Sequence, residues 1–167
     1  MKFDTTFAFS HPLKVVSLVA PATILGALAI ERAGYPPCAL CLYQRIPYYL
    51  LCALFILIVP FSNSEIARRY YLPFALFVLA ILIVSGGLGL FHAGVEFSFW
   101  KGPSGCSGSI DTTDMKTLLE TLRNTKAVSC TKASFWVLGL SLSVWNSIIS
   151  FGLAGVVVGG LVRRRGV

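Results

Sequence analysis

The sequence predicts an all-α membrane protein, a four-transmembrane-helix bundle with two external cysteine-bearing loops and a short amphipathic helix. Hydrophobic residues make up 56% of the 167 residues and charged residues only 13%, about half the charged share of an ordinary soluble domain. The hydrophobic residues fall into four separate runs. Little polar sequence remains for a second unit, so we expect a single integral-membrane domain over residues 1–167.

Each of the four apolar runs predicts a transmembrane helix. A straight helix needs about 20 residues to cross the hydrocarbon core, so flanking aromatic and small residues should extend the two shorter runs. Prolines within or beside the runs are compatible with membrane helices. The motif Ala27-Leu28-Ala29, after two lysines and an apolar stretch, leaves a cleaved signal peptide as an alternative for the first run. The predicted spans are about 15–30, 46–61, 72–90 and 144–162.

Lysine and arginine indicate the orientation of the chain. They are dense in the tails 1–14 and 163–167 and in the loop 62–71. The loops 31–45 and 91–143 hold as many, but over more than twice the length and together with acidic residues. The positive-inside rule therefore predicts cytoplasmic termini and two external loops. The net charge of +7 arises at the ends of apolar runs, not in a basic stripe with interleaved aromatics, so we expect no nucleic-acid partner.

This topology places four of the five cysteines on one side of the membrane. Cys38, Cys41, Cys106 and Cys130 lie in the external loops, whereas Cys52 lies within the second span. Four external cysteines are typical of an oxidising compartment. Cys52 is expected to be a small core residue.

The second external loop shows three features. The aromatic residues 97, 99 and 100 follow the third span and predict an interfacial belt. Glycine, serine and proline over residues 102–108 predict an accessible turn around Cys106. Apolar residues at helical spacing over 114–128 predict an amphipathic helix. Such a helix lies flat on the bilayer or packs on the protein itself, and the pattern does not distinguish the two.

The Cys38-Ala39-Leu40-Cys41 pair carries the clearest chemical signal. Two thiols at this spacing form a redox-active disulfide, a structural disulfide or part of a metal site, and the predicted location favours the first. Prolines at 36 and 37 predict a helix N-terminus, where the dipole favours a thiolate. Pro47 points the other way, since the residue before a proline is disfavoured in a helix; the helix would then begin at Pro47 and leave the pair in a turn.

Three further residues are candidates for a site. Arg45 follows Cys41 by four residues and is either a donor to a ligand oxygen that becomes negative or an anchor that extends to the headgroups. His92, at the outer end of the third span, is either an interfacial residue or a hydrogen-bond donor and proton carrier near the first pair. Cys106 and Cys130 would form either a static bridge or one that a partner thiolate can attack.

Four segments together resemble the disulfide-bond formation protein B (DsbB) family, over nearly the whole chain. The resemblance implies a four-helix thiol:quinone oxidoreductase of the bacterial inner membrane, with cytoplasmic termini and periplasmic cysteine loops. The segments are Cys-Ala-Leu-Cys-Leu-Tyr-Gln-Arg at 38–45, Phe-His-Ala-Gly-Val-Glu-Phe-Ser-Phe-Trp at 91–100, Gly-Pro-Ser-Gly-Cys at 102–106, and Cys130 followed by residues 136–146.

The resemblance also implies roles for the cysteines. A reduced periplasmic thioredoxin-like oxidase (DsbA-like) would attack a Cys106–Cys130 bridge, with Cys106 forming the mixed disulfide. Electrons would then pass to Cys38–Cys41. The unpaired Cys52 and a somewhat compact second loop are the main departures from the family pattern.

The implied cofactor is a quinone, ubiquinone or menaquinone. Cys41 would supply the thiolate that contacts it, and Arg45 and His92 match the quinone-side residues of the family. The chain contains no Cys-x-x-Cys-His haem motif and no Gly-x-Gly-x-x-Gly dinucleotide motif, so a membrane-borne acceptor fits the remaining possibilities. No metal is expected.

Two other functions remain as alternatives. A membrane scaffold would hold zinc or two inert disulfides with its four external cysteines; structural zinc sites usually draw on two close pairs, and the second pair here is widely spaced. A vitamin-K-epoxide-reductase-like enzyme also couples cysteine pairs to a quinone. Its loop cysteines would precede the short pair, however, and in this sequence the short pair comes first.

Overall fold

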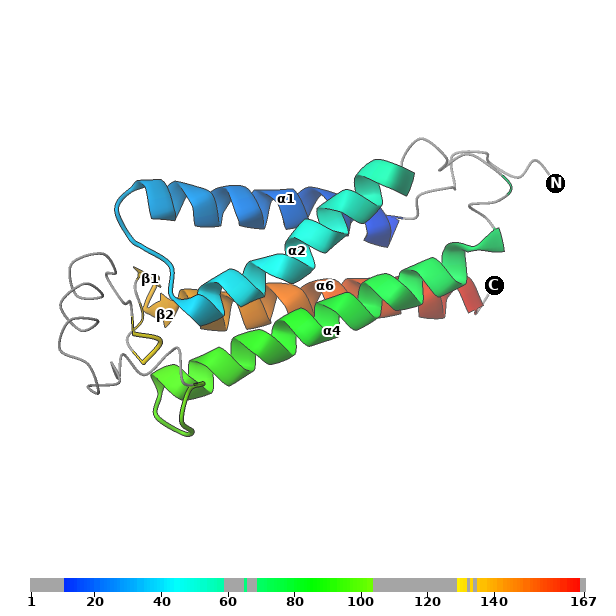
Figure 1. Cartoon of the computed structure of the whole chain (residues 1–167). Coiled ribbons are helices and arrows are strands. Elements are labelled where there is room, and N and C mark those ends of the chain that lie inside the picture. The colour runs from blue at the N-terminus through cyan, green and yellow to red at the C-terminus, as the bar shows by residue number, and fades with distance from the viewer. Residues whose placement is uncertain are drawn as a thin grey trace, which may run out of the picture.

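The structure is a computed structural model and describes residues 11–58, 65, 69–103, 129–131, 133 and 135–165. The described residues contain four long helices that run alongside one another (Figure 1). Each is long and apolar enough to cross a membrane, which confirms the predicted four-helix bundle. The helices are α1 (His11–Arg32), α2 (Ala39–Ile58), α4 (Tyr71–Glu96) and α6 (Leu142–Arg165).

The second helix begins earlier than the sequence indicates. It starts at Ala39, and the backbone N–H of Leu42 donates to the carbonyl of Cys38 at 3.2 Å. Pro47 is buried in the interior of the helix, so the expectation that the helix begins at Pro47 is wrong. Packing of the inward face, which also includes Tyr48, outweighs the local effect of the proline. Arg45 therefore belongs to the helix and not to the preceding loop.

The other helices also extend beyond the apolar runs. α1 spans 11–32 where the run covers 15–30, and α4 reaches Glu96 where the run ends at residue 90. The last turns of α4 bury the polar His92 together with Ala93 and Val95, which a hydropathy pattern does not register. The segment around His92 is therefore helical.

The bundle buries small and large apolar side chains at its centre and also carries large apolar side chains on its outer surface. Helices α1, α2, α4 and α6 contact one another in a closed ring of pairs. Large apolar side chains such as Leu18, Ile56 and Val84 are more than half exposed on the outer surface, as expected for faces that contact lipid. The buried core includes Val16, Ala20, Leu51, Phe55, Val78, Leu82 and Val157.

Helices α4 and α6 approach especially closely, through glycine and serine. A methyl group added at Gly89 would overlap the hydroxyl of Ser147, and one added at Gly86 would lie 2.8 Å from the ring of Phe151. The Asn146 amide donates to the carbonyl of Ser85 at 3.1 Å. Small and hydroxyl-bearing residues allow such contact between helices in a membrane, where apolar burial between helices provides little drive.

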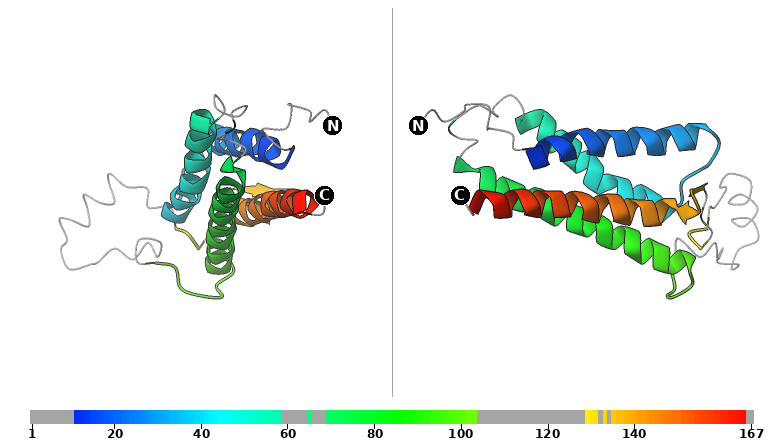
Figure 2. Two further views of the ribbon diagram at one scale, coloured as in Figure 1. Left: turned by 90° about the vertical axis from the view of Figure 1, so that its right-hand side faces the viewer. Right: turned by 180° about the vertical axis from the view of Figure 1, so that it is seen from behind.

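The links α1–α2 and α4–α6 both leave the bundle at the same end, opposite the start of α1 and the end of α6 (Figures 1 and 2). A small antiparallel hairpin of β1 (Trp136–Val137) and β2 (Leu140–Ser141) lies at this end. Its turn residues Leu138 and Gly139 have φ values of 51° and 79°. This hairpin was not predicted from the sequence, because strands of two residues leave no alternating pattern to detect.

The structure describes only one of the three features predicted for the second loop. The aromatic segment after α4 is described: Phe97, Phe99 and Trp100 are exposed, and the Trp100 indole donates to the carbonyl of Phe91 at 2.8 Å. A membrane-interface role for this segment stays a prediction. The expected amphipathic helix over 114–128 lies outside the described residues, as does Cys106.

Candidate redox site

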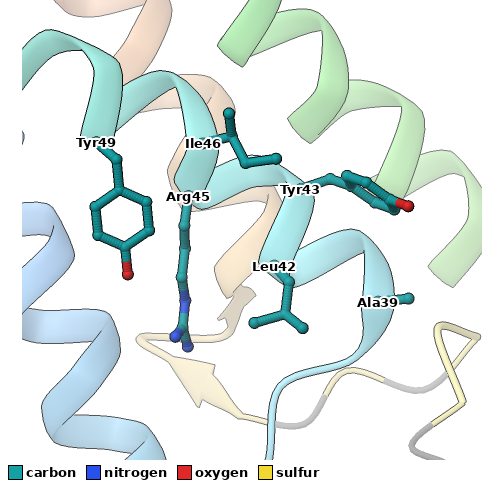
Figure 3. A pocket seen from close by; sticks show the side chains of 6 residues that line it. All are labelled: Ala39, Leu42, Tyr43, Arg45, Ile46 and Tyr49. Atoms are coloured by element: carbon teal, nitrogen blue, oxygen red, sulfur yellow. The ribbon is translucent and has the colours of Figure 1, made fainter.

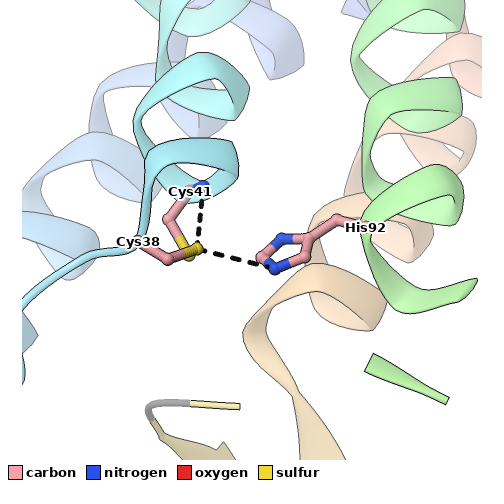
Figure 4. A group of neighbouring side chains, drawn as sticks. All are labelled: Cys38, Cys41 and His92. Carbon is pink, nitrogen blue, oxygen red and sulfur yellow. Dashed lines mark hydrogen bonds between the residues drawn. The ribbon is translucent and has the colours of Figure 1, made fainter. Parts of the chain in front are cut away.

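Two sulfurs and an imidazole meet at the end of the bundle that carries both links (Figure 4). The Sγ atoms of Cys38 and Cys41 are 2.9 Å apart, and the Cys38 sulfur lies 3.6 Å from Nε2 of His92. Both cysteines are free thiols. The structure thus joins the predicted pair from the start of α2 with the predicted histidine from the last turns of α4.

The Cys-x-x-Cys spacing places the two thiols at the start of α2 in a defined way. The carbonyl of Cys38 accepts the first helical hydrogen bond, and its Sγ accepts the backbone N–H of Cys41 at 3.3 Å. Cys38 therefore occupies the N-cap position, where a side-chain acceptor satisfies an otherwise unpaired N–H of the first turn. The positive end of the helix dipole also favours an anion there. The N-terminal position predicted from the two prolines is confirmed.

Cys38 is the more acidic member of the pair. The hydrogen bond between the Cys38 and Cys41 side chains is the largest influence that lowers the pKa of Cys38, from 9.0 to about 4. The hydrogen bond from His92 and the Cys41 backbone N–H lower this pKa further, whereas burial opposes the shift. Cys38 is consequently the thiolate of the resting reduced pair near neutral pH, and a thiolate is the species that exchanges disulfides. The Cys41 thiolate that the resemblance implies at the quinone stays a prediction.

His92 lies in the interior and is held by polar partners on both ring nitrogens. Its Nδ1 is 2.7 Å from the side-chain nitrogen of Gln44, and its Nε2 is 3.6 Å from Oε1 of Glu96. The side chain of His92 is 2% exposed and that of Glu96 is 8% exposed. Ser143 donates a 2.6 Å hydrogen bond to Oε2 of Glu96.

Sequence reasoning missed Gln44, Glu96 and Ser143. Gln44 follows Cys41 by three residues and Glu96 follows His92 by four, so helical spacing could have placed each beside a predicted site residue. Ser143 comes from α6, and only the packing of α6 on α4 brings it to Glu96. No local signal could have identified it.

Cys130 links the second pair to this site. It is completely buried and disulfide-bonded, and it packs in one buried cluster with Cys38, Leu40 and Val95. The predicted partner, Cys106, lies outside the described residues, so the Cys106–Cys130 pairing stays a prediction. One cysteine of each pair, Cys38 and Cys130, therefore lies in the same buried cluster.

Arg45 lies on a different side of α2 from His92. Its Nη1 donates to Oε2 of Glu31 on α1 at 2.6 Å, and its side chain is 13% exposed. Arg45 is thus paired with an acidic side chain within the protein, and its role as a ligand donor or a headgroup anchor stays a prediction. Gln44 reaches α4 and Arg45 reaches α1, as about 100° of helical rotation between consecutive residues allows, and no described hydrogen bond or ion pair joins Arg45 to His92.

A groove of about 430 Å³ runs beside Arg45 on α2 (Figure 3). Its walls are mainly apolar and include two tyrosine side chains, with the guanidinium as the charged group. Such a combination suits a flat ring that carries carbonyl oxygens. The groove is lined by Ala39, Leu42, Tyr43, Arg45, Ile46 and Tyr49.

The donor atoms of Cys38, Cys41 and His92 lie within 4.8 Å of one another and could hold a metal ion. A structural zinc site uses four ligands, and Zn–S bonds of about 2.3 Å at a tetrahedral angle separate two sulfurs by about 3.8 Å. The two sulfurs here are 2.9 Å apart. Zinc would therefore have to push them apart, so the arrangement suits sulfur–sulfur exchange better than metal ligation.

Comparison of the sequence with known proteins identifies the family of the chain. The family model for Disulfide bond formation protein DsbB matches residues 11–159, which include α1, α2, α4, most of α6 and the redox site. The chain belongs to the DsbB family. Family membership makes it a disulfide-generating oxidoreductase and a multi-pass membrane protein.

The individual relatives have low sequence identity to this chain, but the similarity extends over most of each protein. The DsbB-family chain is 26% identical to an uncharacterized protein of Rickettsia prowazekii over 92% of its own length and 86% of the relative's. It is also 26% identical to Disulfide bond formation protein B of Xylella fastidiosa (strain Temecula1), over 79% of its own length and 78% of the relative's. No solved structure matches the chain at a significant level.

Proposed function

We propose that this DsbB-family chain is a thiol:quinone oxidoreductase that reoxidises a periplasmic thioredoxin-like oxidase (DsbA-like). The observation that carries the proposal is the buried cluster that contains both Cys130 and Cys38, because exchange between the two pairs requires one sulfur of each pair to meet. A protein with two inert bridges would not need to bury a cysteine of each pair together.

The first exchange uses the second pair. A thiolate of the reduced partner attacks Cys106 of a Cys106–Cys130 disulfide, which forms a mixed disulfide and releases the Cys130 thiolate. Cys130 then attacks Cys38 of the Cys38–Cys41 disulfide, and Cys41 leaves as a thiolate. Each step breaks one sulfur–sulfur bond and forms another, so no external oxidant is consumed.

The second exchange restores the bridge. The remaining thiol of the partner resolves its mixed disulfide and releases Cys106, which attacks Cys130 of the Cys130–Cys38 bond. Cys38 leaves as a thiolate, and its pKa of about 4 makes it a good leaving group. The partner ends as a disulfide, the Cys106–Cys130 bridge is restored, and Cys38 and Cys41 hold the electron pair.

The residues around α2 fit a quinone, ubiquinone or menaquinone. Arg45 would bind a ring oxygen from the groove wall, with Tyr43 and Tyr49 against the ring. Cys41 lies one helical turn before Arg45, on the approach to this position. A bound quinone supplies an acceptor for two electrons and two protons. On the opposite side of α2, His92 contacts Cys38 and can take up or return its proton.

The proposed orientation follows the charge distribution. The redox site lies at the end of the bundle with the α1–α2 and α4–α6 links (Figure 1), and the positive-inside rule makes that end periplasmic in the bacterial inner membrane. The thioredoxin-like partner would then reach Cys106 from the periplasm, whereas Arg45 lies within the membrane-spanning helix.

The test is quinone reduction by the purified protein with a reduced thioredoxin-like partner. Wild type should reduce ubiquinone or menaquinone, and Cys41→Ser should abolish the reaction. Cys52→Ala is the matched control, because Cys52 is a free thiol that packs against the core of the bundle away from the pair. If wild type reduces neither quinone and carries stoichiometric zinc, the scaffold alternative holds instead.

A further inference from the structure

We propose that Glu96 exchanges a proton with Cys38 through His92 during the redox cycle, and that Ser143 positions Glu96 for this exchange. The inference deepens the proposed function, since it assigns a buried proton acceptor to the reaction of the Cys38–Cys41 pair.

One nitrogen atom connects the thiol to the carboxylate. Nε2 of His92 lies 3.6 Å from Sγ of Cys38 and also 3.6 Å from Oε1 of Glu96. The Nε2–Sγ distance is within hydrogen-bonding range for sulfur, whereas the Nε2–Oε1 distance must shorten by about 0.6 Å to reach an ordinary hydrogen bond. An imidazole that faces both a thiol and a carboxylate can carry a proton between them.

The other carboxylate oxygen is held by a chain of hydroxyl groups. Ser143 donates to Oε2 of Glu96 at 2.6 Å, so its own oxygen must accept the hydrogen of Ser141, 2.8 Å away. Both serines are buried. This chain fixes Glu96 on the side of His92 and leaves Oε1 directed at Nε2.

Gln44 allows His92 to change its protonated nitrogen. The Gln44 amide lies 2.7 Å from Nδ1 and can either donate its N–H or, after an amide flip, accept with its oxygen. With the oxygen toward a protonated Nδ1, Nε2 is free to accept a proton. The ring therefore has a hydrogen-bond partner before and after transfer.

The proton transfer is balanced within the site. A dithiol that reduces the disulfide delivers two protons with the electron pair. One stays on the Cys41 thiol. The other passes from the Cys38 sulfur to Nε2 and on to Oε1 of Glu96, so Cys38 remains the thiolate. The negative charge moves from the carboxylate to the sulfur, so the buried site keeps the same net charge. The proton leaves Glu96 by the same route when the electron pair passes to the quinone, which takes up two protons.

The polar groups around His92 and Glu96 come from α2, α4 and α6. Helix α2 presents Cys38, Cys41 and Gln44, and α4 presents Glu96, whereas α6 presents only the uncharged Ser143. Glu31 is paired with Arg45 on the α1 side. Glu96 is thus the carboxylate placed to exchange a proton with the ring. A purely structural Glu96 would connect α4 to α6 through Ser143 and would stay ionised in both redox states.

Infrared difference spectroscopy on the whole protein, reduced minus oxidised with dithiothreitol and without added quinone, distinguishes these roles. Reduction should produce the C=O band of a protonated carboxylic acid that shifts in D₂O. Glu96→Gln keeps the size and the hydrogen bond to Ser143 but should lose the band. Glu65→Gln makes the same change at an exposed position and should keep it. A band that is absent in wild type, or that persists in Glu96→Gln, overturns the proposal.

Further variants separate proton exchange from structure. Glu96→Asp should retain a carboxylic acid band at a changed frequency, and Ser143→Ala should shift the band while Ser143→Thr restores it. These measurements need no quinone. If the carboxylic acid band appears but the protein reduces no quinone, the proton relay is supported and the proposed function is wrong. If the protein reduces quinone but the band is absent, only the relay is wrong.

Discussion

The acidity of Cys38 can be tested by the pH dependence of its reaction with a small pyridyl disulfide. The suitable protein is the reduced chain with Cys52→Ala, Cys106→Ser and Cys130→Ser, in which only the Cys38–Cys41 pair carries thiols. The reaction rate follows the thiolate fraction. Since burial of Cys38 slows the reaction equally at every pH, the midpoint of the profile reports its pKa.

The expected magnitude follows from the shift of the pKa from 9.0 to about 4. At pH 5 such a thiol is about 90% ionised, whereas an ordinary one is about 0.01% ionised. A thiolate of lower pKa is also a weaker nucleophile, by about 180-fold for this difference with a Brønsted coefficient of about 0.45. The net expectation at pH 5 is a rate about 50-fold above that of an equally accessible ordinary thiol.

The source of the shift can be separated by two variants. Cys41→Ala removes the largest influence and should move the midpoint to higher pH, and His92→Ala should move it in the same direction by a smaller amount. A midpoint near 9 in the parent protein would refute the assignment of Cys38 as the thiolate. A midpoint that stays near 4 in both variants would refute the stated cause.

Three other substitutions have defined outcomes. Gly89→Val places a side chain against Ser147, where overpacking costs about 1–3 kcal/mol; thermal unfolding in detergent should shift to lower temperature, and an unchanged midpoint would contradict the close α4–α6 contact. Arg45→Leu removes the described ion-pair partner of the Glu31 carboxylate and the charged group of the groove. The KM for quinone should rise while exchange with a reduced dithiol partner persists, and an unchanged KM would exclude Arg45 from the quinone site. Cys52→Ala should leave both reactions near wild-type rates, and an inactive variant would overturn the assignment of the two pairs.

The fold was predictable because hydropathy reports lipid exposure directly. Four apolar runs gave four helices, since a bilayer-spanning segment needs a continuous apolar stretch. The ends were less predictable. The proline rule misplaced the start of α2, because burial of Pro47 and Tyr48 compensates for one missing hydrogen bond. The polar residues His92 and Glu96 extend α4 beyond its apolar run because they face each other inside the bundle.

The site was predictable as far as it depends on local spacing. Cys38 and Cys41 were recognisable as a pair, and their position at a helix start follows from the prolines before them. His92 of α4 meets Cys38 and Gln44 from the start of α2, and Ser143 of α6 holds Glu96, so the site depends on how α2 and α6 pack on α4. The buried cluster that contains Cys130 and Cys38 likewise depends on the path of the second loop, which no sequence pattern specifies.

The N-cap position of Cys38 has a consequence for the redox potential of the pair. Only the reduced form carries the thiolate that the helix start, Cys41 and His92 stabilise; in a disulfide this charge does not exist. The part of the pKa shift that counts is the part below both the ambient pH and the ordinary thiol pKa. Each pKa unit of that part stabilises the reduced form by about 1.4 kcal/mol, which is equivalent to about 30 mV for a two-electron couple. The first turn of α2 therefore makes the pair a stronger oxidant, which draws electrons inward from the periplasmic bridge.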